Sequence, residues 1–499
     1  MRTVTIEVAT TWIRFKCSRE GDFNGIDIKY YINSNCQERE FDPRTRRTKL
    51  IARYTRYDED TGYAYIPRYM LNTLMEYLIT QDSTVTIEQV PIAPVDTAKI
   101  DMPLAPDLQL KPVQEPVVEF LTDEKLGFRP LALGTGMGKT VSSIYAACKL
   151  GYPTLISLGL LIEQWYDSIL KFTEISRDDI YIVKGFDTLA SLWKGIENGF
   201  RPKILLFSTR TLSLYAVSNN PPYSELPSYE ELLKQLQIGT KIVDECHLNF
   251  NTNTLIDLYS NVKMNIYLSA TYQRSNYQGR KIFNLVFPEE YKFGEQFVRK
   301  YTTVYICGYH LNIAERDINR FKSFKGYNHA KYENFLVRYK DVLAYYITTV
   351  IKPCIYNYFT LLKKEKQHCL ILVQTQLFAT LLATKIAGID GNKVSVFFAG
   401  HKSEYGDLAN LEADIIISTI KSCGVGRDIK NLKTCINTVS FSSVPQCIQL
   451  LGRLREIPGE ETIYVDTYST EIPHHVRHMH NRSAIYYVRA AKVHKANLN

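Results

Sequence analysis

The stretch LGTGMGKT, residues 133–140, follows the short apolar run Pro130–Leu133 and precedes the helical run Val141–Leu150. A glycine-rich turn between a strand and a helix lets backbone N–H groups approach phosphate oxygens, and the helix N-terminus adds a favourable dipole. The strict pattern has glycine at the first position, where this chain has Leu133. We predict a phosphate-binding loop; the alternative is a glycine-rich turn that binds nothing.

The predicted loop assigns a role to each of its polar side chains. Lys139 is expected to contact the β- and γ-phosphates of ATP, and the Thr140 hydroxyl to bind Mg²⁺. The remaining loop positions are expected to surround the nucleotide with backbone, and these are Gly134, Thr135, Gly136 and Gly138.

The sequence VDECH, residues 243–247, ends another apolar strand. In a parallel sheet its carboxylates emerge at the same edge as the phosphate loop. Asp244 is therefore predicted to hold Mg²⁺, and Glu245 to polarise the attacking water. An isolated D-E-x-H is weak evidence, but after a phosphate loop and a strand it is strong.

Short apolar runs alternate with helical segments along most of the chain, which predicts parallel sheets covered by helices. The strand candidates of a first α/β domain are Pro130–Leu133, Pro153–Leu158, Lys203–Ser208, Thr240–Val243 and Asn265–Ser269. Those of a second are a strand beginning near Thr302, His368–Val373, Lys393–Phe398, Ala413–Ser418, Cys435–Phe441 and Thr462–Val465. The helix-rich segment 320–366 is longer than a linker needs and is a candidate insertion.

The remaining parts of the chain complete a four-part division. Residues 1–105 are expected to form a small α+β module with a helix around Pro67–Ile79, followed by a proline-rich linker from Val90 to Pro116. The two α/β domains are expected at 106–300 and 301–472, and a basic tail at 473–499.

These motifs, in this order, resemble superfamily 2 helicases. The resemblance implies two tandem RecA-like domains that hydrolyse ATP between them, with LSAT at 268–271 relaying the state of the γ-phosphate. It further implies that Gln114 reads adenine, and that Gln164 and Thr209 contact the nucleic-acid backbone. The chain departs from the family at Ser157-Leu158, where Pro-Thr is usual.

The second domain carries two more segments that resemble helicase motifs. Thr419 is expected to touch nucleic acid, and Gly426 and Asp428 to face the nucleotide. In QLLGRLR, residues 449–455, Arg453 and Arg455 are candidate arginine fingers. Most relatives space these arginines three apart; here they are two apart, so either can be the finger.

The N-terminal module carries the clearest indication of substrate. Residues 41–57 contain six basic residues, one acid and two interleaved tyrosines, a mixture that suits nucleic acid. The alternative is a solvated hairpin face. The candidate contacts are Arg44, Arg46, Arg47 and Arg53. The segment resembles the N-terminal domain of phage UvsW-type branch-migration helicases, which implies remodelling of Holliday junctions, forks and displacement loops.

Composition agrees with a folded intracellular protein. The net charge is +8, which suits a polyanionic partner, and the ten cysteines show no metal-ligand spacing. No apolar run of membrane-spanning length is present. We expect a cytoplasmic protein of an infected bacterium, with ATP and Mg²⁺ as cofactors and branched, duplex or single-stranded DNA as partner.

Two further readings of function stay open. A weaker similarity to poxvirus-type transcript-release helicases implies an RNA substrate, and the motor motifs also suit a translocating subunit that separates no strands. In the C-terminal tail, four clustered histidines invite a metal site; the alternative is a partly exposed basic helix that meets DNA phosphates or solvent.

Overall fold

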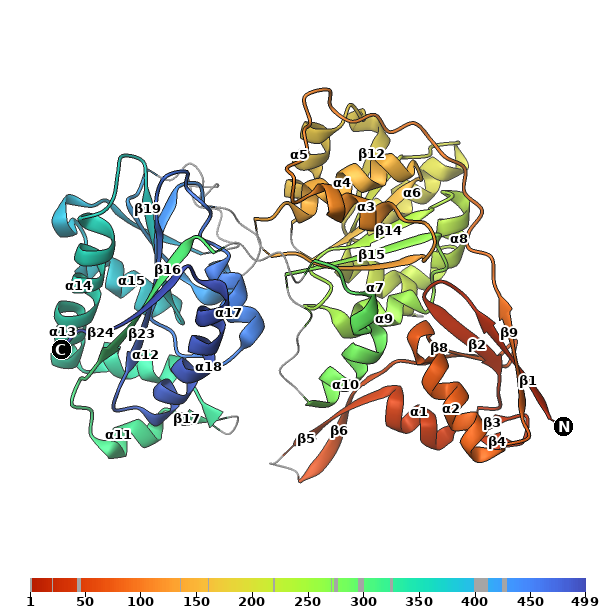
Figure 1. The fold of residues 1–499 in the computed structure, drawn as a ribbon, viewed down its shortest axis with the longest axis horizontal. Coiled ribbons are helices and arrows are strands. Elements are labelled where there is room, and N and C mark those ends of the chain that lie inside the picture. Colours follow the sequence, from red (N-terminus) through yellow and green to blue (C-terminus); the bar gives the residue numbers. More distant parts are fainter. Residues whose placement is uncertain are drawn as a thin grey trace. The chain divides into compact units, whose positions relative to one another are not determined.

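The computed structural model describes residues 2–19, 21–42, 46–134, 136–159, 161–218, 220–270, 272, 277–294, 300–323, 326–398, 412–423 and 429–499. The chain divides into two compact units, Met1–Phe297 and Val298–Asn499. Each unit contains a large parallel sheet flanked by helices, as Figure 1 shows. The predicted α/β fold class is confirmed. Among the described residues, none of the helices is long and apolar enough to cross a bilayer.

The first unit begins with a five-stranded sheet of order β7-β8-β2-β1-β9. β1 pairs antiparallel with β2 and parallel with β9, and the helix expected around residues 67–79 forms as a 3-10 turn followed by α2. The bounds are β1 Thr3–Val8, β2 Trp12–Lys16, β3 Asp22–Phe23, β4 Ile26–Asp27, α1 Lys29–Asn35, β5 Gln37–Asp42, β6 Arg47–Arg53, β7 Arg56–Asp58, β8 Tyr63–Pro67, η1 Arg68–Met70, α2 Leu71–Gln81 and β9 Thr86–Pro91.

β5 and β6 pair outside that sheet as a separate antiparallel hairpin (Figure 1). In its register Glu40 lies opposite Lys49, and Asp42 lies opposite Arg47. A directly opposed pair of unlike charges, such as Glu40 and Lys49, stabilises a hairpin by roughly 0.2–1 kcal/mol. The hairpin therefore carries acidic residues on one strand beside the basic residues of the other.

The second sheet of this unit has six parallel strands in the order β10-β15-β14-β11-β13-β12. Its strands are almost wholly buried because helices cover both faces. All five predicted strands are present, and β12 was not predicted. The bounds are α3 Glu115–Thr122, β10 Phe128–Ala132, α4 Lys139–Leu150, β11 Thr154–Leu158, α5 Ile162–Phe172, β12 Ile180–Val183, α6 Phe186–Glu197, β13 Ile204–Ser208, α7 Thr209–Val217, α8 Tyr229–Gln235, β14 Thr240–Val243, α9 Phe250–Asp257, β15 Met264–Ser269 and α10 Tyr277–Val286.

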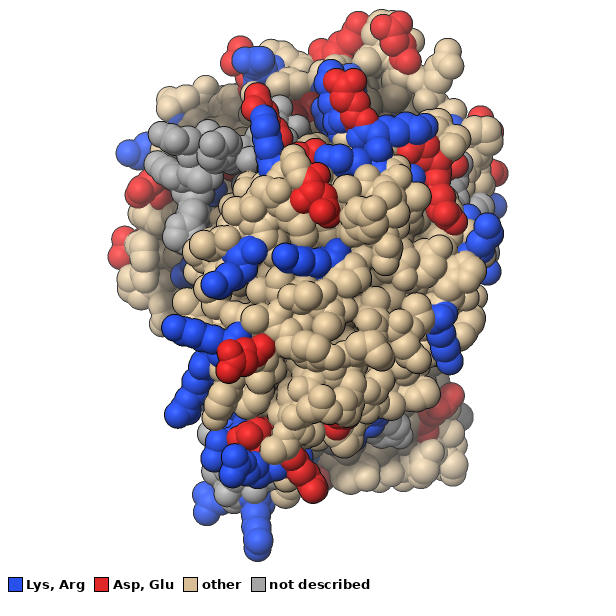
Figure 2. Space-filling view, turned by 90° about the vertical axis from the view of Figure 1, so that its left-hand side faces the viewer, with Lys and Arg blue, Asp and Glu red and all other residues tan. Residues whose placement is uncertain are grey.

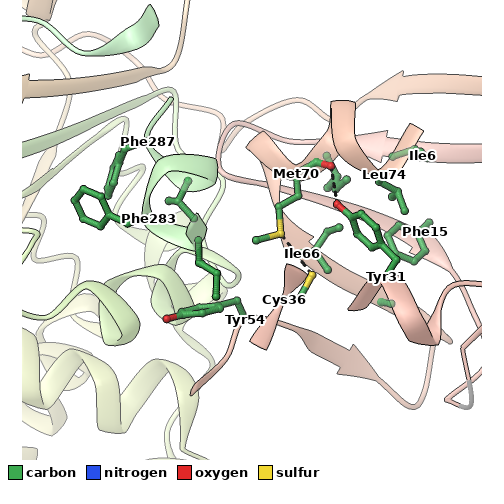
Figure 3. Packing of buried hydrophobic residues seen from close by; sticks show 14 of the residues in the cluster. Ile6, Phe15, Tyr31, Cys36, Tyr54, Ile66, Met70, Leu74, Phe283 and Phe287 are labelled. Carbon is green, nitrogen blue, oxygen red and sulfur yellow. Dashed lines mark hydrogen bonds between the residues drawn. The ribbon is translucent and has the colours of Figure 1, made fainter. Parts of the chain in front are cut away.

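The two sheets of the first unit share one hydrophobic core. Side chains of the N-terminal module such as Tyr54 and Met70 belong to the same buried cluster as Phe283 of α10 and Phe287 directly after it, and Figure 3 shows these groups facing one another. Tyr54 also packs on Phe250 with ring centroids 5.8 Å apart. The N-terminal module is therefore fixed to the parallel sheet by packing.

The proline-rich segment after β9 runs along the parallel sheet. Its backbone forms hydrogen bonds from Val95 to Asn261 and from Ile100 to Gly151, and Leu104 forms an isolated antiparallel bridge with Thr173. The segment is extended, as expected, and it is held along most of its length. The division of this unit near residue 105 stays a prediction.

The second unit is built on seven parallel strands in the order β20-β21-β19-β22-β23-β16-β24. The predicted strands are present with boundaries shifted by a few residues, and β24 was not predicted. The bounds are β16 Thr302–Tyr309, α11 Glu315–Arg320, β17 Lys322–Ser323, β18 Gly326–Tyr327, α12 His329–Arg338, α13 Lys340–Tyr346, α14 Lys352–Ile355, β19 His368–Val373, α15 Gln376–Lys385, β20 Val394–Phe397, β21 Ile415–Thr419, α16 Ile420–Cys423, β22 Leu432–Asn437, α17 Val444–Leu451, β23 Thr462–Ser469, α18 Pro473–Arg489 and β24 Lys492–Asn497.

Two segments of this unit differ from their sequence-based interpretation. Residues 320–366 supply α12, α13 and α14, whose buried side chains share a core with strands β19 and β21, so the segment is the crossover that covers one face of the sheet. Residues 473–499 form α18 and the edge strand β24, which pairs parallel with β16. The C-terminal segment is thus part of the unit's own sheet and core.

Candidate functional site

The phosphate loop lies between β10 and α4, at the carboxyl end of the parallel sheet. Gly136 and Gly138 adopt φ values of 82° and 94°, a left-handed region that L side chains avoid. Helix α4 begins at Lys139, directly after Gly138. The loop therefore presents a helix N-terminus to the predicted phosphates, as an anion site requires. Thr135 lies outside the described residues.

Gln114 lies against this loop. Its side chain is buried, and its Oε1 accepts the backbone N–H of Lys111 at 2.9 Å. A Cβ at Gly138 would lie 1.9 Å from Gln114 Nε2, so no other residue fits there without displacing Gln114. The structure thus brings Gln114 to the predicted nucleotide site, and its reading of adenine stays a prediction.

Two acidic residues follow β14 at the same edge of the sheet. Lys139 Nζ lies 3.1 Å from Glu245 Oε1, which joins the two predicted motifs directly. Burial and the charge of Glu245 raise the pKa of the Asp244 carboxyl. Burial also opposes ionisation of Glu245, but the charges of Lys139 and His247 outweigh it and lower the pKa of Glu245. Glu245 is therefore the ionised partner of Lys139.

The backbone and hydrogen bonds around this acidic pair are unusual. Glu245 has a φ of 47°, a conformation that non-glycine residues rarely adopt and that tends to occur at functional sites. His247 Nδ1 lies 2.9 Å from Ser269 Oγ and 3.3 Å from Glu245 Oε2. His247 thus connects the catalytic candidate to the segment predicted to relay the state of the γ-phosphate.

The sequence-based interpretation missed Trp165. Its indole Nε1–H donates to Asp244 Oδ2 at 2.9 Å, and its side chain is almost fully buried. The sequence holds one indication that Trp165 lies near the site: it directly follows Gln164 on the helix after the second strand. A contact across 79 positions of sequence cannot be derived from spacing.

The side chains of this site fit a nucleotide with Mg²⁺. Mg²⁺ retains several waters and takes few ligands from protein, usually one or two carboxylates together with substrate phosphates. Asp244 and the Thr140 hydroxyl supply that set, and Lys139 at the start of α4 supplies positive charge for phosphate oxygens. Among the described residues, no group of three or more His, Cys, Asp or Glu forms a dedicated metal cage.

The predicted nucleic-acid contacts of the first unit differ in exposure. Gln164 is exposed on α5. Thr209 is buried at the start of α7, and its hydroxyl forms a hydrogen bond of 2.9 Å with Ser157 Oγ. Gln164 can therefore meet a partner directly, whereas the Thr209 hydroxyl already has one inside the protein.

The basic residues of the N-terminal module separate into two sets. Arg46, Arg47 and Arg53 are exposed on the hairpin, and Arg44 lies outside the described residues. Arg56, by contrast, contacts Glu230 at 2.5 Å, and its guanidinium lies over Tyr259 at 4.1 Å. Arg56 therefore helps to fix the module to the parallel sheet.

In the second unit, Thr419 ends β21, and its hydroxyl donates to Ser422 Oγ at 2.9 Å. Arg453 and Arg455 are half-buried directly after α17, while Gly426 and Asp428 lie outside the described residues.

Among the described side chains drawn in Figure 2, lysines and arginines are interspersed with acidic residues around a broad uncharged area. That face does not gather them into one basic surface.

Two of the C-terminal histidines, the buried His475 and the half-buried His478, belong to a polar cluster. His475 is buried, accepts the backbone N–H of Ser469 at 3.2 Å and lies 2.5 Å from the Tyr327 hydroxyl. Burial and nearby cations hold the pKa of His475 well below its usual range and lower that of His478 to about 4. Arg482 pairs with Asp466 at 2.9 Å, both fully buried. The expected basic face on this helix is thus partly turned into the core.

Comparisons with known proteins agree with this geometry. No family model matches the sequence. A helicase candidate, 161L, of Invertebrate iridescent virus 6 is 33% identical over 147 residues, which is 28% of this chain and 28% of that protein. The DNA-bound type ISP restriction-modification enzyme LlaBIII matches with a TM-score of 0.52 and 13% identity, over 85% of this chain and 34% of that enzyme.

The motifs at residues 133–140 and 243–247 resemble those of superfamily 2 helicases. The crystal structure of T4 UvsW aligns over 100% of both chains at 13% identity, with a TM-score of 0.38. The likeness to LlaBIII concerns the fold alone. The chain spans about a third or less of the lengths of LlaBIII and of the viral relative.

Proposed function

We propose that the chain is an ATP-dependent DNA helicase or translocase that remodels branched DNA, such as four-way junctions, forks and displacement loops. The observation that supports ATP hydrolysis best is the 3.1 Å contact between Lys139 of the phosphate loop and Glu245 at the end of β14. It brings the predicted phosphate ligand and the predicted water-orienting carboxylate to one edge of one sheet.

Each side chain of the site has a defined part in hydrolysis. Lys139 would exchange the Glu245 carboxylate for phosphate oxygens, which leaves Glu245 able to accept a hydrogen bond from the attacking water. Asp244 and Thr140 would hold Mg²⁺, which supplies charge that offsets the charge developing on the phosphates. Arg453 or Arg455 would complete the site from the second unit.

The preference for branched DNA rests on the N-terminal module. Its hairpin exposes Arg46, Arg47 and Arg53, while the shared core holds the module against the nucleotide-binding sheet. A basic arm fixed to a motor domain can grip duplex phosphates while the motor acts on one arm of a junction. The resemblance to UvsW-type helicases supports recombination-dependent phage replication in an infected bacterium as the setting.

The test is a panel of nucleic acids in an ATPase assay with Mg²⁺, at constant ionic strength. We expect a four-way DNA junction to stimulate hydrolysis more than duplex DNA, single-stranded DNA or single-stranded RNA of equal nucleotide content. Strongest stimulation by RNA would favour a transcript-release helicase instead. Stimulation by duplex DNA without strand displacement would indicate a translocating motor that separates no strands.

A further inference from the structure

Trp165 occupies a position from which it can control the predicted metal ligand. It lies on α5, within the hydrophobic core beneath the phosphate loop, with 1% of its surface exposed. Its indole nitrogen can only donate a hydrogen bond, and it donates to Asp244 Oδ2 at 2.9 Å. The other oxygen of the same carboxylate, Oδ1, accepts the backbone N–H of Glu245 at 2.9 Å.

These two donors fix the plane of the Asp244 carboxylate. One donor is a rigid ring packed in the core, and the other is the backbone at a residue with a constrained φ, so neither can follow a rotation of the carboxylate. Partners that hold a ligating side chain in this way tune metal binding without touching the metal. Each oxygen keeps a further lone pair for Mg²⁺ or for one of its waters.

A purely structural role for the indole N–H is the alternative, since a buried tryptophan usually has a partner. The same fold contains a matched example in Trp193, which is also buried and whose Nε1–H donates to Tyr215 Oη at 3.2 Å. Trp193 lies on α6, away from the phosphate loop, and its partner is not a predicted metal ligand.

We propose that Trp165 is a positioning residue that sets the Asp244 carboxylate for Mg²⁺ binding. The inference rests on the proposed function, because it requires Asp244 to be the metal ligand of an ATP site. Trp165→Phe removes the N–H donor and keeps an aromatic ring in the core. Trp193→Phe makes the same change where no metal is expected.

The first test measures binding of Mn²⁺, a spectroscopic substitute for Mg²⁺, to the complex with a non-hydrolysable ATP analogue. We expect Trp165→Phe to weaken Mn²⁺ binding by about 10- to 100-fold, the usual effect of losing such a partner. In turnover, the Mg²⁺ concentration at half-maximal rate should rise, while KM for ATP at saturating Mg²⁺ changes little. Trp193→Phe should match the wild type in each measurement.

The second test needs no substitution at Trp165. The chain has three tryptophans, Trp12, Trp165 and Trp193. In protein labelled with 5-fluorotryptophan, addition of Mg²⁺ to the nucleotide complex should shift the ¹⁹F line of Trp165 and leave that of Trp193 in place. In Asp244→Asn the Trp165 shift should disappear.

The outcomes separate this inference from the proposed function. A wild-type protein that neither hydrolyses ATP nor binds the nucleotide with Mn²⁺ would refute the proposed ATP site itself. A wild-type protein that does both, with Trp165→Phe equal to it in Mn²⁺ affinity and Mg²⁺ dependence, would overturn the role of Trp165. An unmoved Trp165 line in active wild-type protein would overturn it as well.

Discussion

Glu245 combines three properties expected of a catalytic side chain. It is ionised because Lys139 lies 3.1 Å away, it adopts a rare backbone conformation, and it lies beside the predicted metal ligand Asp244. We predict that Glu245→Gln retains ATP and Mg²⁺ but hydrolyses ATP about 10²- to 10⁴-fold more slowly, because only the group that orients water is lost.

This prediction is checked by measuring nucleotide affinity and single-turnover hydrolysis on the same preparation. Asp244→Asn is the comparison, since it should weaken Mg²⁺ binding as well as lower the rate. Loss of ATP binding in Glu245→Gln, with hydrolysis limited only by that loss, would contradict a role in the chemical step.

Arg482 forms a buried ion pair that is expected to stabilise the second unit. Its Nε and Nη2 donate to the two oxygens of Asp466 at 2.9 and 3.0 Å, and both side chains are fully buried. We predict that Arg482→Met lowers the stability of the second unit by about 3–5 kcal/mol, because it leaves the Asp466 carboxylate buried without its cation.

Hydrogen exchange of peptides from β23 and α18 measures this change locally. Arg477→Met on the exposed side of the same helix is the matched control, and it should alter stability by no more than about 0.5 kcal/mol. Equal exchange in the two variants would show that the buried pair contributes nothing particular.

The arginines of the basic hairpin are expected to contact duplex phosphates, and the salt dependence of DNA binding measures these contacts. If Arg44, Arg46, Arg47 and Arg53 each neutralise one duplex phosphate, replacing all four with alanine reduces the salt slope of DNA binding by up to ~3.6 units, at about 0.9 per contact. ATP affinity should be unaffected, because no hairpin residue belongs to the nucleotide site.

A second quadruple variant controls for the loss of charge alone. Alanine at the exposed Lys125, Lys149, Lys194 and Lys234 removes the same charge elsewhere on the first unit. Junction binding and unwinding should fall with the hairpin variant and stay near wild type with the control. The same salt slope for both variants would identify the hairpin as a solvated face.

A strand can be predicted from the sequence when its own residues carry a clear hydrophobic pattern. Strand β19 was predicted with its observed bounds because Cys369–Val373 is an uninterrupted apolar run. β24 was missed because its residues, Lys492–Asn497, are polar and it lies at a sheet edge. An edge strand needs little burial, so its sequence carries a weak signal.

Some residues of the candidate site could likewise be predicted from the sequence and others could not. The phosphate loop and the acidic pair were predicted from short motifs, and the structure brings Lys139 to Glu245. The partner of Asp244 was not predictable, because Trp165 reaches it only through packing between β14 and α5. The burial of Arg482 had the same cause, since a basic residue on a helix is normally exposed and only Asp466 on β23 changes that.

The candidate fingers Arg453 and Arg455 belong to the second unit, and the proposed function gives them a part in hydrolysis. A finger acts on charge that develops in the transition state. We predict that Arg453→Ala and Arg455→Ala suppress DNA-stimulated hydrolysis strongly while ATP affinity stays near wild type. The true finger should show the larger loss, of about 10³-fold or more.

Glu456→Gln is the control, because Glu456 lies three residues after Arg453, at the spacing that the resembled family usually has between its two arginines. It should hydrolyse ATP at close to the wild-type rate. If neither arginine variant slows hydrolysis appreciably, the segment 449–455 does not supply the finger.

We propose that hydrolysis at Lys139 and Glu245 drives the remodelling of branched DNA. The test measures how far a labelled four-way junction is separated into its arms. Wild-type protein and Lys139→Ala are compared at saturating ATP and Mg²⁺. We predict that the wild type separates the arms of the junction only with hydrolysable ATP, and that Lys139→Ala binds the junction but does not separate its arms. Junction separation that proceeds equally without ATP, or equally with Lys139→Ala, would contradict the account.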